Sequence, residues 1–359
     1  MLSLRGKRGS DRRLPAKAAA RALLAAGLAV TLGVAAAAGQ ARSKRRPGPF
    51  GRAVMALAVD HTAPATLYAG TGGGVFRSVD GGTSWAPLDP EFAGLSVGAL
   101  AIDHTSPTTV WVGTGAGIFK KTPGGARRMA IETEMGGLFV GALAIDPSAA
   151  ATVYAGTGSG VFKSVDGGGS WKQVGHGLTN QFVTTLAIDA SAPTTLYAAT
   201  NGGGVFKTAD GGTSWKAANG GLKSAIVLAL AIDPKAPATL YAQTVEGVFK
   251  TADGGRSWAP ANNGLASRFT MTLAIAPGAS ETLYAGTANG VFKSVDGGAN
   301  WIAASSGLTN PFVMSLAIDP SDPAVLYAGT DGGIFKTSTA GLSWSELKRN
   351  NDERRGTGD

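Results

Sequence analysis

Residues 183–217 read VTTLAIDASAPTTLYAATNGGGVFKTADGGTSWKA, and variants of this phrase recur seven times along the chain of 359 residues. The phenylalanine of a "VF" or "IF" pair marks each repeat, and successive markers are 43 residues apart except for one step of 44. The markers are Phe76, Phe119, Phe162, Phe206, Phe249, Phe292 and Phe335. A period in the low forties, made of short strands and glycine-rich turns, is typical of β-propeller blades.

Each repeat contains four segments with strand character, separated by turns rich in glycine, proline, serine and aspartate. In the quoted repeat these segments are 183–189, 195–200, 205–209 and 215–218. Hairpins between consecutive segments give one antiparallel sheet per repeat, and sheets arranged around an axis leave only short, protected edges. We therefore predict an all-β fold, a seven-bladed β-propeller with four antiparallel strands in each blade.

The positive charge of the chain is concentrated outside the repeats. Residues 1–50 hold eleven Lys and Arg against one acidic residue, whereas residues 51–344 hold seventeen against nineteen. A nearly neutral repeat array lacks the basic surface that nucleic-acid binding requires, so we predict no nucleic-acid partner. The chain contains no cysteine, which excludes disulfides and thiolate metal sites.

The N-terminal segment has the pattern of a secretory signal: basic residues, an apolar run over 23–38, then small residues. The run is short for a membrane span. We expect a signal peptide over 1–41, a basic linker over 42–50, the propeller over 51–348 and a disordered tail over 349–359. The predicted location is secreted or periplasmic. The alternative is an N-terminal membrane anchor, if the leader is retained.

A second motif, S/T-x-D-x-G-x-x-W, joins the third and fourth segments of five repeats. It resembles the Asp-box, or BNR repeat, of the sialidase-like superfamily. We expect each aspartate to accept hydrogen bonds from amides of its own turn and each tryptophan to pack between blades. The residues concerned are Asp80, Trp85, Asp166, Trp171, Asp210, Trp215, Asp253, Trp258, Asp296 and Trp301. A calcium loop needs further carboxylates that the motif lacks, so we predict no metal and no cofactor.

Two repeats depart from this motif. The second reads KTPGGARR over 121–128, which puts Pro123 in place of the aspartate and Arg128 in place of the tryptophan. The seventh keeps Trp344 but has Thr339 in place of the aspartate. We expect the second blade to be the irregular one.

Sialidase activity is not expected from this chain. Sialidases use an arginine triad and a tyrosine nucleophile, but every tyrosine here occupies the same "LYA" or "VYA" position of a repeat. The repeat wording is also similar to the propellers of xyloglucanases, which cleave glycosides with two carboxylates about 5–10 Å apart. A glycoside hydrolase acting on β-glucans is therefore the alternative function. Its catalytic candidates are Glu91, Glu132 and Glu134, and Asp89, Glu246 and Asp331 are further loop acids.

The array is also similar to single-propeller assembly and stability factors of photosystem II, and to exported bacterial proteins with BNR repeats. These resemblances imply a non-catalytic binding or scaffold module. We expect a monomer whose partner is a protein or polysaccharide of the cell envelope.

Four phenylalanines outside the markers share one repeat position just before the first strand: Phe139, Phe182, Phe269 and Phe312. They either ring the mouth of the central channel or pack between blades. Arg268, Lys223 and Gln181 lie near them in the sequence and complete the candidate binding residues. Aromatic residues with polar neighbours are typical of interfaces.

A cation follows every marker phenylalanine: Arg77, Lys120, Lys163, Lys207, Lys250, Lys293 and Lys336. Such a ring could attract an anionic polymer. Since each cation lies three residues before the motif aspartate, or before the residue replacing it, we expect either local pairing with the acidic turn of the same blade or a solvated edge.

Overall fold

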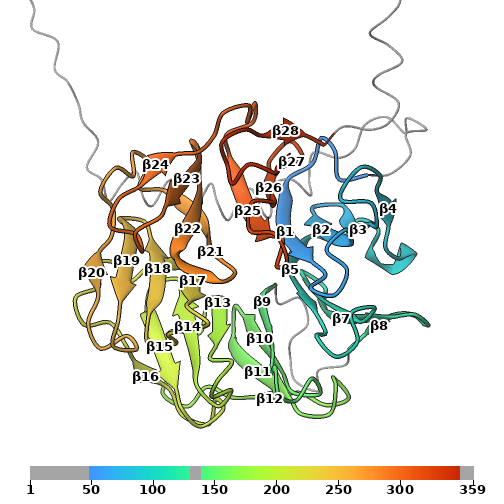
Figure 1. The fold of residues 1–359 in the computed structure, drawn as a ribbon. Helices are drawn as coiled ribbons and strands as arrows, with labels where there is room; N and C mark the ends of the chain where they lie inside the picture. Colours follow the sequence, from blue (N-terminus) through green and yellow to red (C-terminus); the bar gives the residue numbers. More distant parts are fainter. Residues whose placement is uncertain (1–47, 130–138, 348–359) are drawn as a thin grey trace, which may run out of the picture. The chain divides into compact units, whose positions relative to one another are not determined.

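The computed structural model describes residues 48–129 and 139–347 (Figure 1). The predicted signal peptide, most of the predicted linker, the predicted tail, and the candidates Glu132 and Glu134 lie outside these residues.

The described residues form seven sheets of four antiparallel strands, each built in chain order from one repeat. The innermost strands are β1 (Val54–Val59), β5 (Val97–Ile102), β9 (Val140–Ile145), β13 (Val183–Ile188), β17 (Val227–Ile232), β21 (Thr270–Ala276) and β25 (Val313–Ile318). The second strands are β2 (Leu67–Thr71), β6 (Val110–Thr114), β10 (Val153–Thr157), β14 (Leu196–Thr200), β18 (Leu240–Thr244), β22 (Ala279–Thr287) and β26 (Leu326–Thr330).

The third strands are β3 (Gly74–Ser78), β7 (Gly117–Thr122), β11 (Gly160–Ser164), β15 (Gly204–Thr208), β19 (Gly247–Thr251), β23 (Gly290–Ser294) and β27 (Ile334–Thr337). The outer strands are β4 (Ala86–Pro87), β8 (Gly125–Arg128), β12 (Lys172–Gln173), β16 (Lys216–Ala217), β20 (Ala259–Pro260), β24 (Ile302–Ala303) and β28 (Ser345–Glu346). One 3-10 helix, η1 (Pro90–Phe92), follows β4. We number the blades 1 to 7 in this order.

The innermost strands of consecutive blades lie side by side, and β25 of blade 7 lies beside β1 of blade 1, so the ring is closed (Figure 1). The predicted seven-bladed β-propeller is therefore confirmed.

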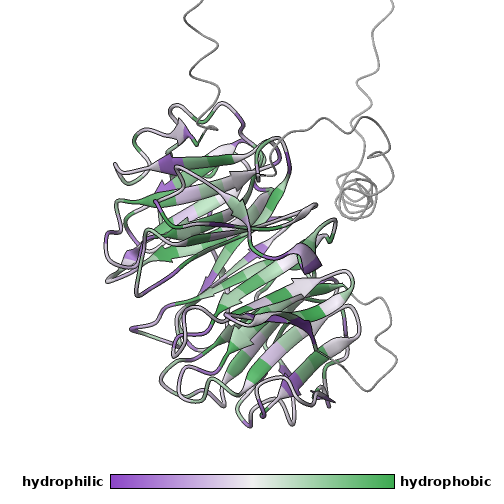
Figure 2. Cartoon of the chain, turned by 90° about the vertical axis from the view of Figure 1, so that its right-hand side faces the viewer, coloured by the Kyte–Doolittle hydropathy of each residue, from purple (hydrophilic) through white to green (hydrophobic). Residues whose placement is uncertain are grey.

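The hydrophobic core lies between blades. Every residue of β14 is buried, and the equivalent five residues are buried in all other blades. Tyr197 of blade 4 packs in one cluster with Phe249 and Trp258 of blade 5. Figure 2 shows the same separation, with hydrophobic residues along the strands and hydrophilic residues mainly in the turns. A strand that is covered on both faces reads as a continuous apolar run, which explains the "TLYA" wording.

Five turns between third and fourth strands share one hydrogen-bond pattern, and we call them the aspartate turns: 78–85, 164–171, 208–215, 251–258 and 294–301. In the third of these, Asp210 accepts from Thr208 Oγ1 at 2.7 Å and from the Ser214 amide at 2.9 Å. Its second oxygen accepts from Ser214 Oγ. These donors, with the Ser214 hydroxyl the strongest, lower the pKa of Asp210 to about 2.

Blade 7 builds the same turn without the aspartate. Thr339 Oγ1 accepts from the Ser343 amide at 3.0 Å, which replaces one bond of the carboxylate. The next residue, Ala340, has φ +53°, whereas the equivalent residues of the aspartate turns are glycines such as Gly211 and Gly254. An L-residue with a side chain is strained in this left-handed region.

The structure corrects the predicted alignment of blade 2. There Thr122 pairs with Gly125 and Lys121 pairs with Ala126, so the hairpin is tighter than an aspartate turn. Arg128 pairs with Phe119, as Pro87 pairs with Phe76 in blade 1. The prediction that Arg128 takes the tryptophan position is therefore wrong. The shorter turn shifts the register, and Ala126 occupies that position.

The prediction that the repeated cations pair with the acidic turn of their own blade is wrong. Six lysines instead donate to a main-chain carbonyl oxygen in the turn of the next blade. The pairs are Lys120 and Gly167, Lys163 and Gly211, Lys207 and Gly254, Lys250 and Gly297, Lys293 and Ala340, and Lys336 and Gly81. The aspartates are already occupied by donors of their own turns, so the long lysine side chains reach across the blade gap.

Tyrosines reinforce this contact, which we call the lysine latch. Lys250 Nζ lies 2.9 Å from the Gly297 oxygen, and Tyr241 Oη donates to the same oxygen at 3.1 Å. The ammonium also lies 5.4 Å from the centroid of the Tyr241 ring. In blade 1 the cation is Arg77, whose guanidinium carbon lies 5.9 Å from the centroid of the Tyr68 ring.

Replacing Ala340 by glycine should stabilise the protein by about 1 kcal/mol, because glycine adopts a positive φ without the clash of a Cβ. Urea unfolding measures the change. The control is Ala252→Gly, at a turn residue without a positive φ, which should be neutral or destabilising. An Ala340→Gly protein no more stable than the parent would contradict the strain.

Replacing Lys250 by methionine should lower the unfolding free energy by about 1–2 kcal/mol, because a charge-assisted hydrogen bond and a cation–π contact are lost together. The exposed Lys172, on β12, gives the matched control Lys172→Met, which should change stability by less than about 0.5 kcal/mol. Equal losses in the two variants would show that the latch adds nothing.

Candidate functional site

The connections between blades and the turns that join the second and third strands of each blade lie at the same end of the ring. We call this end the connection face; its turns are 72–73, 115–116, 158–159, 201–203, 245–246, 288–289 and 331–333. Main-chain bonds fix connections to turns here: Asn201 N donates to Phe182 O at 2.9 Å, and Gly202 N donates to Ala225 O at 3.0 Å. The aspartate turns lie at the other ends of the third strands. Loops held on a rigid scaffold are the usual place for binding residues.

The phenylalanines of the connection face differ in exposure. Phe139, Phe269 and Phe312 are half-buried, whereas Phe182 is 38% exposed. The ring of Phe139 covers Gly98 of blade 2 so closely that a Cβ at Gly98 would lie 2.3 Å from its Cζ. Phe139 therefore contributes to packing between blades 2 and 3. In blade 5 the position equivalent to Phe139 is taken by Ile226. An apolar, non-aromatic residue at this position is a sequence signal for packing.

The backbone of Phe182 is held by hydrogen bonds, and the residue is partly exposed. Its amide donates to Asn180 Oδ1 at 3.1 Å, and its carbonyl accepts from the Asn201 amide. Among the large apolar side chains that the structure shows as exposed, the others lie in aspartate turns, in the equivalent turn of blade 7 or on β24. Phe182 is thus an exposed aromatic at a fixed position on the connection face.

The polar candidates surround this end of the ring. Gln181 precedes Phe182, Lys223 lies in the connection between blades 4 and 5, and Arg268 precedes Phe269; all three are exposed. Glu91 lies on η1 and is also exposed. They present polar groups around the phenylalanines without occupying one pocket.

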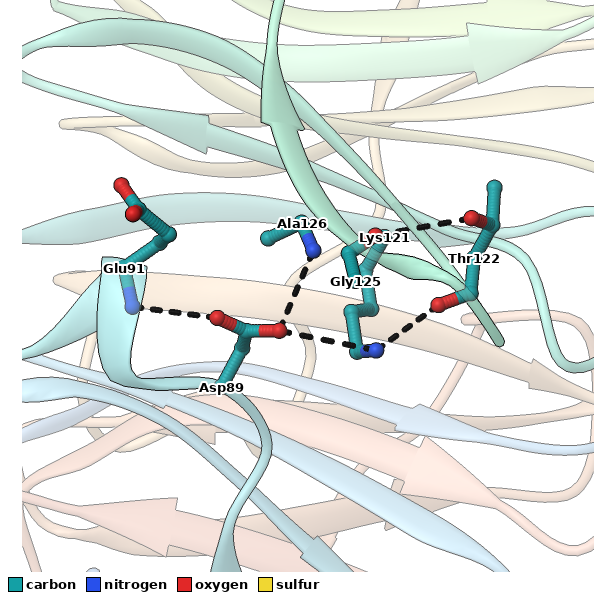
Figure 3. A network of polar contacts seen from close by, with 6 residues as sticks. All are labelled: Asp89, Glu91, Lys121, Thr122, Gly125 and Ala126. Atoms are coloured by element: carbon teal, nitrogen blue, oxygen red, sulfur yellow. Dashed lines mark hydrogen bonds and ion pairs between the residues drawn. The ribbon is translucent and has the colours of Figure 1, made fainter.

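Asp89 has a structural role between blades 1 and 2, as Figure 3 shows. One carboxylate oxygen accepts from the Ala126 amide at 3.1 Å and lies 3.5 Å from Lys121 Nζ. The other oxygen accepts from the Glu91 amide. Lys121 also donates to the Thr122 carbonyl at 2.7 Å. Asp89 thereby ties blade 1 to the blade whose aspartate turn is missing.

The described candidate carboxylates Glu91, Glu246 and Asp331 are spread around the ring. They come from the blade 1–2 connection, blade 5 and blade 7 respectively. A general acid needs a pKa near the working pH, but hydrogen bonds from Ser170 and Ser257 lower the pKa values of Asp166 and Asp253. Within 48–129 and 139–347, no group of three or more His, Asp or Glu side chains could hold a metal ion.

Grooves of about 530, 600 and 450 Å³ lie between outer strands of neighbouring blades, at the blade 5–6, 4–5 and 2–3 gaps. Latch lysines and aspartate turns line them: Lys250 and Asp296 line the first of these grooves. Because these residues repeat, the grooves follow from the blade architecture. No helix among the described residues has the length and apolar character that a membrane span requires.

No protein-family model and no curated protein sequence matches this chain. Solved structures do resemble it. A GH74 xyloglucanase from Xanthomonas campestris matches with a TM-score of 0.72 and 18% identity, over 85% of this chain and 56% of that one. An extracellular domain assigned to a hybrid two-component system of B. thetaiotaomicron matches with a TM-score of 0.65 and 17% identity, over 81% of this chain and 39% of that one.

YCF48 bound to D1 peptide matches with a TM-score of 0.61 and 13% identity, over 80% of this chain and 92% of that one. The chain thus spans nearly all of YCF48 but only about half the length of the GH74 structures. At these identities the comparisons show a shared propeller fold.

Replacing Asp89 by alanine should lower the unfolding free energy by about 1–3 kcal/mol, because the Ala126 amide and the Lys121 ammonium lose a mostly buried partner. Thermal or urea unfolding gives the value. Glu91→Ala, two residues away and exposed, is the matched control and should change stability by less than about 0.5 kcal/mol. A stable Asp89→Ala protein would contradict the structural role.

Proposed function

We propose that this protein is an exported, non-catalytic propeller that binds a protein or polysaccharide partner of the cell envelope through its connection face. The observation that carries the proposal is Phe182, a partly exposed aromatic residue whose main chain is fixed by Asn180 and Asn201. Aromatic residues dominate interface energetics, and a side chain that is already positioned loses little entropy on binding.

The surroundings of Phe182 support the proposal. Gln181, which precedes Phe182, is exposed, and Lys223 and Arg268 are exposed on the next two connections of the same face. Polar residues of this kind are common at the rim of interfaces. Structural neighbours include a peptide complex of YCF48, xyloglucanases and extracellular domains. The same fold therefore occurs in a peptide-binding protein and in enzymes that act on a glycan. Export rests on the signal-like leader, and the nearly neutral repeat array argues against nucleic acid.

The alternative is a β-glucan hydrolase, favoured by the likeness to GH74 xyloglucanases. Its carboxylates would be Glu91, Glu132 and Glu134. Release of reducing ends from xyloglucan that disappears in Glu91→Gln or Glu134→Gln would replace the proposal by this function.

Phe182→Ala should weaken partner binding about tenfold or more, since truncation of an aromatic hot spot costs more than about 1.4 kcal/mol. Two measurements cover the two partner classes: retardation of the protein in gels containing xyloglucan or other envelope polysaccharides, and photo-crosslinking in cells from p-benzoylphenylalanine at position 182. The control position is Val165, which is 64% exposed and lies in an aspartate turn. Identical crosslinks from both positions, or unchanged retardation of Phe182→Ala in a gel that retards the parent, would contradict the assignment of this face.

A further inference from the structure

Two fully buried polar side chains at the interface of blades 5 and 6 have no hydrogen-bond partner. Gln243, in β18, is 0% exposed, and neither its amide oxygen nor its amide nitrogen is bonded. The hydroxyl of Thr270, the first residue of β21, is also buried and unbonded. Burying such groups without a partner destabilises a protein.

Both residues depart from the repeat at positions that face each other. Where blade 5 has Gln243, the other blades have Gly70, Gly113, Gly156, Ala199, Gly286 and Gly329. Where blade 6 has Thr270, the other blades have Val54, Val97, Val140, Val183, Val227 and Val313. These positions touch across the blade gap: a Cβ at Gly286 would lie 2.7 Å from Val313 Cγ1, and one at Gly70 would lie 2.5 Å from Val97 Cγ1.

The direction of the Gln243 side chain follows from the strand. Residues two apart on a strand point to the same side, and the hydroxyl of Tyr241 contacts Gly297 of blade 6. Gln243 therefore points toward blade 6, where Thr270 begins the innermost strand. One interface thus replaces a glycine–valine contact by a glutamine–threonine contact.

We propose that this interface is a binding site for one internal water molecule, held by the Gln243 amide and the Thr270 hydroxyl. The donor set selects the ligand: Gln243 offers both a donor and an acceptor, so the ligand must accept and donate, as water does. Buried waters typically make about three hydrogen bonds, and this site offers three groups. A monovalent cation bound by Gln243 Oε1 and Thr270 Oγ1 would leave the N–H groups of Gln243 without an acceptor.

The site lies directly beneath the connection face. Thr270 follows Phe269, and its amide donates to the Arg268 carbonyl at 3.1 Å. The water would brace the start of β21 and, through it, the position of two candidate binding residues. The proposal does not depend on the proposed function.

A crystal structure of the full chain at atomic resolution tests the site. We expect a solvent peak within about 2.7–3.2 Å of the Gln243 amide and of Thr270 Oγ1. A direct bond between the two side chains with no solvent peak would overturn the proposal. So would an anomalous signal at this site in crystals grown with rubidium chloride, because it would identify a cation site.

A double-mutant cycle tests the coupling in solution. Gln243→Gly and Thr270→Val should each lower the unfolding midpoint, because each leaves the other polar group without its bridge. The double variant restores the glycine–valine contact of the other blades and should unfold at a higher temperature than either single variant. A double variant whose loss equals the sum of the two single losses would show that the residues share no site.

Discussion

Each sheet of this propeller buries its faces only against the two neighbouring sheets. All five residues of β14 and of its equivalents are buried, yet an isolated four-stranded sheet of this composition would expose them to water. Blades 7 and 1 must therefore pack against each other, because otherwise each of them would leave one apolar face exposed to water. That junction has the ordinary contacts: Ser315 Oγ donates to Val54 O at 2.9 Å, and Lys336 reaches Gly81 O. The lysine latch adds a polar, directional bond to this apolar stacking, and it fixes six of the described turns against the preceding blade.

The dependence on neighbours explains why blade 2 needs Asp89. Arg77 of blade 1 lies over Tyr68 as Lys250 lies over Tyr241, but among the described residues no latch bond to blade 2 accompanies this contact. The connection after blade 1 supplies a carboxylate at the same junction, where it binds Ala126 and Lys121. Phe92, next along this connection, stacks edge-on against Phe119 at 5.6 Å. A local loss in one repeat is thus offset by a contact from the preceding connection.

The sequence was sufficient for the fold because its evidence is local and repeated: the phenylalanine period and the four strand segments lie within each repeat. The partners of side chains that cross between blades could not be read in the same way. Lys250 binds a carbonyl 47 residues ahead, and Asp89 binds an amide 37 residues ahead. The sequence also did not reveal that the blade 2 hairpin is tighter than an aspartate turn. The segment KTPGGARR has the same length as the motif it replaces, so its spacing gives no sign of the shifted register. The phenylalanines of the connection face were found as a shared repeat position outside the markers, but their exposure depends on packing.

Phe139 and Phe182 show this dependence most clearly, because they share one repeat position in adjacent blades. The ring of Phe139 covers Gly98 in the preceding blade and lies 3.6 Å from a Cβ built at Gly141. By analogy with Gly98 and Phe139, the repeat would place Phe182 over Gly141 of blade 3. The ring of Phe139 already covers the space beside Gly141. In its own blade, Thr184 lies two residues after Phe182, at the position that Gly141 occupies in blade 3. The same residue type thus covers one blade gap, whereas at the next gap Phe182 is 38% exposed on a fixed backbone.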